Sequence, residues 1–242
     1  MVRFGVGVEC ASSRLGGSVS SKRATTATIG AMSPPTALPW RLVVPVKGGA
    51  GAKSRLHPPP GVDREDLALA LATDCLTACC AGMPPTHVLV VTSDPRAAAV
   101  AEGLGAVVVP APGAGLNAAV AAGRDHALRS SPGTPVAVLL GDLPALRPVD
   151  LVTALGAAAA HPMALVPDAA GEGSTLLTAV DGTRLAPLFG TGSATAHEAT
   201  GHVRLDLDLP RLRTDVDDDA ALRAALALGV GPATLAVLAG TR

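Results

Sequence analysis

Short runs of apolar residues alternate along this chain with longer stretches whose apolar positions recur at helical spacing. The runs at 42–46 and 86–92 are rich in Val and Leu, which is typical of buried strands. Between them, Asp63 precedes a helical pattern that extends to about residue 80. Further strands are expected at 106–109, 136–140 and 164–166, and further helices at 115–129, at 148–160 and after Asp94-Pro95. This alternation predicts an α/β fold with a mostly parallel, doubly wound sheet.

Beyond residue 167, helices and strands no longer alternate regularly. Two glycine-rich segments are expected there, the second with Ser193 as the N-cap of the helix that follows. The expected order is a loop at 171–175, a strand at 176–180, a turn at 189–193, a helix at 194–200, a half-exposed strand at 203–209 and an amphipathic helix at 220–228. Because no repeat or linker interrupts residues 40–242, they are predicted to form one domain.

The first 39 residues have a different composition from the rest of the chain. They are rich in Ser, Thr, Gly and Ala, show no sustained periodicity and lack the continuous apolar centre of a secretory signal. Such a segment predicts a disordered N-terminal extension at 1–39. The alternative is an upstream translation start, with Met32 as the true first residue.

Composition excludes several functional classes. With 48% hydrophobic residues the chain can bury a large core, but aromatic residues make up only 1%, which argues against base stacking on single-stranded nucleic acid. The net charge of −1 provides no basic surface for DNA or RNA. No apolar stretch reaches the ~18 residues of a membrane span. The four cysteines include no Cys-x-x-Cys pair and predict no zinc site. We therefore expect a soluble, cytoplasmic protein.

The segment RLVVPVKGGAGAKSRL at 41–56 joins the first strand to a loop in which glycines alternate with cations. Glycines let backbone N–H groups approach a ligand, and interleaved cations neutralise anionic charge, so the loop favours a polyphosphate. It matches neither the P-loop nor the dinucleotide fingerprint. An ordinary βα loop with solvated charges is the alternative. The residues concerned are Gly48, Gly49 and Gly51 with Lys47, Lys53 and Arg55.

Carboxylates follow two of the later segments. Asp142 comes directly after a buried strand, where it is either a metal ligand or the N-cap of the next helix. Asp215 and Asp217 flank Val216, so in an extended segment both point to one side, and hard oxygen ligands suit Mg²⁺. For Asp217 and the two aspartates after it, negative charge at a helix N-terminus is the favoured interpretation. Asp215 is the stronger metal candidate, and Asp217 is kept as a third ligand.

No nucleophile of the hydrolase type accompanies these groups. The sequence has no Gly-x-Ser-x-Gly elbow, and the His197-Glu198 pair has its next histidine at 202, one residue too late for zincin spacing. His197 is therefore predicted to be structural or to support other site residues.

Six motifs occur in a fixed order: VPVKGGAGAKSRL, GLNAAV at 115–120, GDLPAL at 141–146, GSTLL at 173–177, FGTGSATAH at 189–197 and TDVDD at 214–218. Together they resemble, over about residues 40–228, the guanylyltransferases of deazaflavin coenzyme F-420 biosynthesis that use phosphoenolpyruvate or 2-phospho-L-lactate. The resemblance implies a single-domain nucleotidyltransferase fold of the glycosyltransferase-A-like, Rossmann-like kind. It also implies that a small phosphorylated acid attacks the α-phosphate of GTP and releases pyrophosphate.

Site residues are carried over from the family motif by motif. The resemblance implies metal binding by Asp142 and Asp215, beside which Asp217 is kept as the third candidate, and binding of the phosphorylated acid by Thr175, Gly190 and Ser193. It places the triphosphate on the glycine and lysine loop. It also adds Asn117 to the nucleotide contacts. The catalytic set is then Lys47, Lys53, Asp142 and Asp215.

The acceptor is left open by the residues themselves, because both acids present a carboxylate and a phosphate to the same donors. A phosphate monoester has its second pKa near ~6, so either acid is ionised at neutral pH and needs no general base. The Ala-, Gly- and Arg-rich composition suggests a high-GC bacterium, and bacterial relatives are associated with phosphoenolpyruvate. We expect that acceptor, with a deazaflavin (Fo) transferase as the downstream partner. The alternatives are 2-phospho-L-lactate, a CTP- or UTP-dependent nucleotidyltransferase, and a non-catalytic nucleotide-binding regulator.

Overall fold

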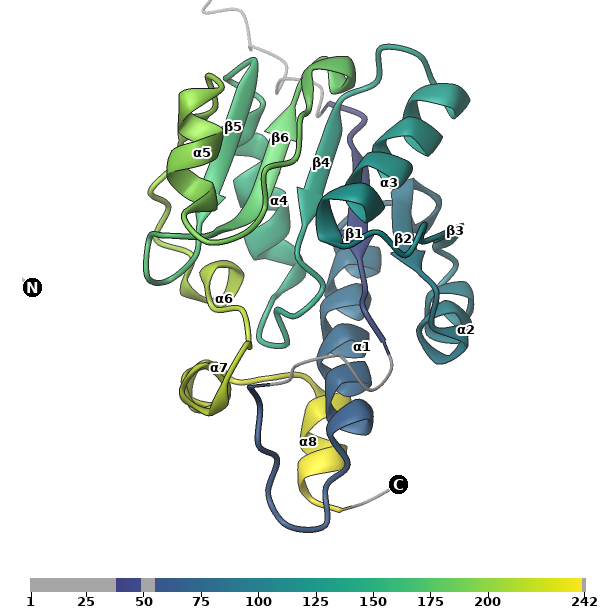
Figure 1. Ribbon diagram of the computed structural model, residues 1–242, viewed down its shortest axis with the longest axis vertical. Coiled ribbons are helices and arrows are strands. Elements are labelled where there is room, and N and C mark those ends of the chain that lie inside the picture. Colours follow the sequence, from purple (N-terminus) through teal and green to yellow (C-terminus); the bar gives the residue numbers. More distant parts are fainter. Residues whose placement is uncertain (1–37, 49–54, 241–242) are drawn as a thin grey trace, which may run out of the picture. The chain divides into compact units, whose positions relative to one another are not determined.

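The computed structural model of the protein describes residues 38–48 and 55–240, whose strands form one seven-stranded sheet (Figure 1). The strand order is β3-β2-β1-β4-β6-β5-β7. Only β6 runs against its neighbours β4 and β5, and the other pairs are parallel, as the alternation of strands and helices predicts. The strands are β1 (Arg41–Pro45), β2 (Val88–Thr92), β3 (Val107–Pro110), β4 (Val136–Leu139), β5 (Met163–Pro167), β6 (Ser174–Ala179) and β7 (Val203–Arg204).

The helices begin largely where their capping residues predict. Asp63 accepts a hydrogen bond from the Glu65 amide at 2.7 Å, and Asp94 accepts one from the Arg96 amide at 2.8 Å. No helix among residues 38–48 and 55–240 is long and apolar enough to cross a bilayer. The helices are α1 (Arg64–Gly82), α2 (Pro95–Gly103), α3 (Leu116–Ser130), α4 (Pro148–Ala158), α5 (Ser193–Ala199), α6 (Pro210–Arg213), α7 (Asp219–Leu228) and α8 (Pro232–Leu238), with short 3₁₀ turns η1 (Pro85–His87) and η2 (Gly182–Arg184).

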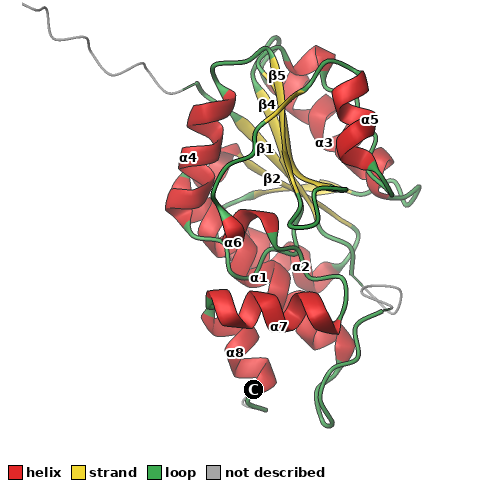
Figure 2. Ribbon diagram, turned by 90° about the vertical axis from the view of Figure 1, so that its left-hand side faces the viewer, coloured by secondary structure: helices red, strands yellow, loops and turns green. Residues whose placement is uncertain are grey.

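Helices cover both faces of the sheet, and alternate strand residues pack on opposite sides (Figure 2). Leu42 and Val44 of β1 point into a cluster with α1, α2, α4 and α6, whereas Val43 points toward α3 and α5. A Cβ on Gly123 of α3 would lie within 2.8 Å of Val91, so a glycine there lets this helix pack closely on the sheet. The fold is therefore a layered α/β structure with apolar clusters on both faces.

A third apolar cluster lies beyond the sheet and joins α1 to the C-terminal helices. Leu56, Leu67 and Leu71 pack there against Val216, and Asp74 of α1 accepts hydrogen bonds from the first amides of α8, Ala233 (3.0 Å) and Thr234 (2.9 Å). The residue after the glycine and lysine loop, Leu56, and the segment around Val216 are thereby packed together.

Three local expectations prove wrong. Only Val203–Arg204 of the expected 203–209 strand pairs with the sheet, because the leucines at 205, 207 and 209 satisfy their alternation by packing against the apolar cluster on one face of the sheet. Ser193 is the first residue of α5, and the N-cap is Gly192 in the left-handed region at φ +69°. Thr175 lies in β6 and not in the loop before it.

Candidate functional site

Three carboxylates meet at the carboxyl end of the parallel strands. Asp142, Asp215 and Asp217 each present one oxygen, and these oxygens all lie within 4.8 Å of one another. The Val216 amide donates a hydrogen bond to the Asp142 carbonyl at 3.1 Å, and the Val216 side chain is fully buried. This backbone contact fixes the register of the later segment, so the aspartates on either side of Val216 come beside Asp142. Asp142 does not cap α4, whose N-cap is Arg147.

The cluster is electrostatically strained without a cation. The pKa of Asp215 is raised to about 7, first by burial and then by the charges of Asp142 and Asp217. A divalent cation would remove this repulsion, and three carboxylate oxygens are the hard ligands that Mg²⁺ or Mn²⁺ takes. The donor set therefore fits a divalent metal ion. The neighbouring Asp218 has a different role, because its side chain accepts a hydrogen bond from the Ala221 amide and caps α7.

A cavity of about 750 Å³ opens beside the carboxylates. Its wall is built from residues that follow four parallel strands, the position where open α/β sheets bind ligands. They include Lys47 after β1, Ser93 after β2, Ala111 after β3, and Gly141 and Asp142 after β4. Gly141 packs so closely that a Cβ on it would lie 2.9 Å from the Pro45 carbonyl oxygen, which explains why a side chain is not accommodated there.

Cations from the glycine and lysine loop face the same cavity. Lys47, Gly48 and Arg55 line it together with the three carboxylates. A Cβ on Gly48 would collide with the carboxylate of Asp94, so the close approach of this backbone depends on glycine. The predicted contacts of Gly49, Gly51 and Lys53 lie outside the described residues and stay predictions.

The residues expected to hold the phosphorylated acid lie to one side. Thr175, Gly190 and Ser193 are not among the described residues that line the cavity. Thr175 is fully buried in β6, where its hydroxyl donates to the Val166 carbonyl at 3.4 Å. Its own carbonyl accepts from the Leu140 amide at 3.0 Å, two residues before Asp142. The strand that carries Thr175 is thus bonded directly to the segment that leads to the aspartate cluster.

The side chain of Asn117 is hydrogen-bonded to the backbone of Phe189. Its Nδ2 donates to the Phe189 carbonyl at 3.0 Å, and its Oδ1 accepts from the Phe189 amide at 2.8 Å. The preceding residues Gly115 and Leu116 do line the cavity. The expected contact of Asn117 with the nucleotide therefore stays a prediction, and the structure shows it bridging α3 and the segment before Gly190.

Sequence reasoning missed the part of the cavity wall formed by Ser93, Ala111 and Gly113. The available signal was position alone, since these small residues follow strands β2 and β3 at the edge where ligands bind. His197, by contrast, has the structural surroundings expected of it. It is fully buried, and burial, with a smaller contribution from His202, lowers its pKa to about 4.

A mostly parallel α/β sheet with three clustered carboxylates, Lys47 and Arg55 around a cavity at its carboxyl edge is the arrangement expected of a nucleotidyltransferase. The chain is similar in structure to a putative nucleotide-diphospho-sugar transferase from Desulfovibrio desulfuricans (TM-score 0.51, 15% identity, 79% of this chain and 96% of that one). It is also similar to a nucleotidyl transferase from Methanothermobacter (TM-score 0.50, 20% identity, 78% and 97%). At these identities the likeness concerns the fold.

Sequence relatives give the family. No protein-family model matches the chain. It is 51% identical over 208 residues to the phosphoenolpyruvate guanylyltransferase of Geodermatophilus obscurus, covering 83% of this chain and 94% of the relative. It is 51% identical over 203 residues to that of Streptomyces coelicolor, covering 83% and 96%. The chain belongs to the phosphoenolpyruvate guanylyltransferase family, which confirms the family resemblance and the nucleotidyltransferase fold expected from its motifs.

Proposed function

We propose that this protein condenses GTP with phosphoenolpyruvate, giving enolpyruvyl-diphospho-5′-guanosine and pyrophosphate. The observation that carries the proposal is the meeting of Asp142, Asp215 and Asp217 with Lys47 and Arg55 around one cavity. The names of relatives that are half identical to this chain support the choice of nucleotide and acid. By the same resemblance, the product would pass to a deazaflavin (Fo) transferase in coenzyme F-420 biosynthesis.

The reaction requires one bond to form and one to break. A phosphate oxygen of the acid forms a bond to the α-phosphorus of GTP. The bond from that phosphorus to the oxygen bridging to the β-phosphate breaks, and its electron pair leaves with pyrophosphate. Because the attacking phosphate is already ionised near neutral pH, no general base is required. Alignment of the two substrates and neutralisation of their charge are the tasks left to the chain.

The charged residues divide between the metal ion and the triphosphate. The three clustered aspartates would hold Mg²⁺, which when bound offsets the negative charge of the phosphates. Lys47 and Arg55, with Lys53 of the same loop, would hold the triphosphate and the departing pyrophosphate. Charge that grows on the leaving group would then develop beside fixed cations.

The phosphorylated acid would be held by Thr175, Gly190 and Ser193. Support comes from the hydrogen bond between the Thr175 carbonyl and the Leu140 amide, which keeps β6 next to the approach to Asp142. The segments are also joined to each other, since the Ala194 amide donates to the Glu172 carbonyl at 3.0 Å. Backbone amides of the 190–193 turn are natural donors to an anionic carboxylate or phosphate.

A nucleotide panel tests the reaction class. Purified protein with Mg²⁺ and phosphoenolpyruvate should release pyrophosphate from GTP, and the Asp142→Asn and Asp215→Asn variants should lose this activity while the exposed-site control Asp208→Asn keeps it. Turnover with CTP or UTP but not GTP would overturn the choice of nucleotide. GTP binding without pyrophosphate release for either acid would indicate a non-catalytic regulator.

A coupled assay identifies the acceptor. The deazaflavin transferase and deazaflavin are added, and each acid is offered separately. Product formed only from 2-phospho-L-lactate would reverse the choice of acid while leaving the guanylyltransferase proposal intact. We also propose that residues 40–242 form the catalytic domain, so removal of residues 1–32 should leave the rate unchanged.

A further inference from the structure

The segment at 188–189 is held by side chains from two helices. Besides the paired bonds between Asn117 of α3 and the Phe189 backbone, the Leu188 amide donates to Nε2 of His197 on α5 at 2.9 Å. Three hydrogen bonds from two side chains therefore fix two consecutive residues of an irregular segment. Gly190 follows directly, at the start of the turn expected to hold the phosphorylated acid.

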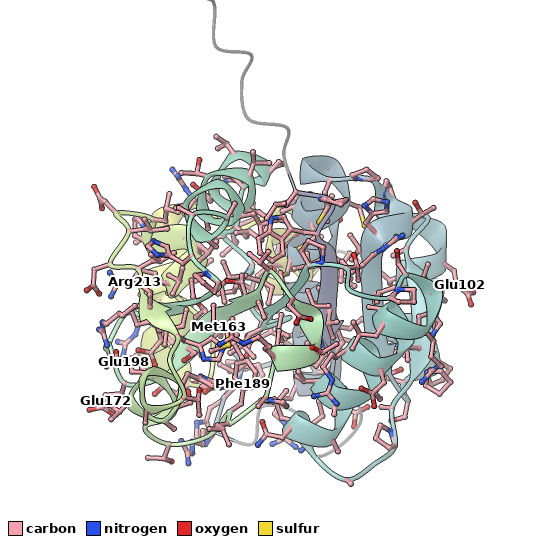
Figure 3. The ribbon with its side chains drawn as sticks, turned by 90° about the horizontal axis from the view of Figure 1, so that it is seen from above. Glu102, Met163, Glu172, Phe189, Glu198 and Arg213 are labelled. Atoms are coloured by element: carbon pink, nitrogen blue, oxygen red, sulfur yellow. The ribbon has the colours of Figure 1, made fainter. Side chains whose placement is uncertain are left out.

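His197 connects this segment to β6. Because its Nε2 accepts the Leu188 N–H, the ring proton sits on Nδ1 and is donated to the Ser174 hydroxyl, 3.0 Å away. The ring also packs edge-on against Phe189, with centroids 5.1 Å apart at an interplanar angle of 72°. Figure 3 shows Phe189 and Met163 toward the middle of the molecule, with Glu172 and Glu198 at its edge. Ser174 precedes Thr175, so one imidazole joins both segments assigned to the acid.

Asn117 connects the same segment to the nucleotide cavity. It is the second residue of α3, directly after Leu116, which lines the cavity. The carboxamide accepts from the Phe189 amide and donates to the Phe189 carbonyl at once, whereas an ionised carboxylate of the same shape has no proton to donate. The amide therefore fixes the separation between the N-terminal end of α3 and the turn.

The 190–193 turn has a backbone that needs such support. Gly190 has φ +145° and Gly192 has φ +69°, and glycines lose more conformational freedom than other residues when they are ordered. The residues before the turn are in neither helix nor strand, so regular hydrogen bonding does not hold them in place. Side-chain bonds to 188–189 set where the turn begins.

We propose that Asn117 and His197 are positioning residues that hold the 190–193 turn for the phosphorylated acid and keep it in register with the nucleotide cavity. The proposal rests on the proposed function. It reassigns Asn117 from nucleotide contact to acceptor positioning. Loss of either residue should impair use of the acid and leave use of GTP nearly unchanged.

Steady-state kinetics with each substrate varied separately test this. Asn117→Asp keeps the size of the side chain but loses the bond to the Phe189 carbonyl, and His197→Phe keeps a ring but loses both bonds. Each should raise the KM for phosphoenolpyruvate, or lower kcat/KM for it, by about tenfold or more, with the KM for GTP within about twofold of wild type. His197→Gln, which retains an acceptor and a donor, should recover part of the loss.

Arg124→Ala is the matched control. Arg124 also lies on α3 and also donates to a backbone carbonyl of the same connection, that of Leu185 at 2.8 Å, three residues before Leu188. Its loss should lower the melting temperature without changing the KM for the acid. If the KM for GTP rises as much as that for the acid in Asn117→Asp, or if Arg124→Ala shows the same kinetic defect, the proposal is overturned.

Hydrogen–deuterium exchange separates this proposal from the proposed function. Phosphoenolpyruvate with Mg²⁺ and GTP should protect amides at 188–193 in the wild type and in Arg124→Ala, but not in Asn117→Asp. If the wild type releases no pyrophosphate, the proposed function fails, and this pattern of protection still decides the positioning role. Equal protection in all three proteins would refute it.

Discussion

Replacing Asp215 with Asn should make the metal-free protein more stable while abolishing turnover. Asp215 is partly buried beside Asp142 and Asp217, and its pKa is raised from 3.8 to about 7. Without a cation beside it, an ionised carboxylate at this position lowers the free energy of unfolding. Asparagine keeps the shape and removes the charge, so the variant should exchange function for stability.

The size of the stability gain expected for Asp215→Asn follows from the pKa of Asp215. Because the folded-state value lies above the unfolded one, the folded chain binds more protons between pH 3.8 and 7 and loses relative stability as the pH rises through that window. A pKa shift of this size means that the ionised Asp215 destabilises the folded protein by at most on the order of 4 kcal/mol. Since Asp142 and Asp217 share the repulsion, we expect Asp215→Asn to gain roughly 2–4 kcal/mol at pH 8 and close to nothing at pH 4.

Urea unfolding with a chelator, at pH 4 and pH 8, measures this difference between variant and wild type. Adding excess Mg²⁺ at pH 8 should shrink or reverse the gain, because the ion stabilises only the intact carboxylate cluster. Asp208→Asn, which removes an exposed carboxylate, should change stability little at either pH. A gain for Asp215→Asn that is the same at both pH values, or that persists in Mg²⁺, would refute the reasoning.

Three further outcomes concern the scaffold. Because the pKa of His197 is lowered to about 4, this residue should contribute on the order of 3 kcal/mol more to the unfolding free energy at pH 6.5 than at pH 4, opposite in sign to Asp215, and urea titrations should show the difference between wild type and His197→Gln growing by that amount over this range. Gly141→Ala should cost about 1–3 kcal/mol because the new Cβ meets the Pro45 carbonyl, whereas Gly156→Ala, with open space in α4, should gain up to about 1 kcal/mol in the same assay. Asp74→Ala should cost about 1–2 kcal/mol, measured by thermal melting, because two α8 amides lose their acceptor.

The sequence by itself determined the features that depend on neighbouring residues. Continuous apolar runs identified the strands of the parallel region and a period of 3.6 residues identified its helices. Asp63 and Asp94 marked helix starts because a cap bonds amides only two or three positions away. The carboxyl end of β4 marked Asp142 for the same reason, since a residue that follows a parallel strand lies at the ligand edge of the sheet.

Tertiary structure alone decided where distant side chains point. The side-chain nitrogen and oxygen of Asn117 both form hydrogen bonds to the backbone of Phe189, 72 positions away, and no local motif could reveal this contact. The leucines at 205, 207 and 209 have the period of a strand but pack against an apolar cluster outside β7, because a two-residue period records burial on one side and not hydrogen bonding. Asp217 joined Asp142 only because Val216 docks on the Asp142 carbonyl, a contact across 74 residues that depends on how the C-terminal segment packs against α1.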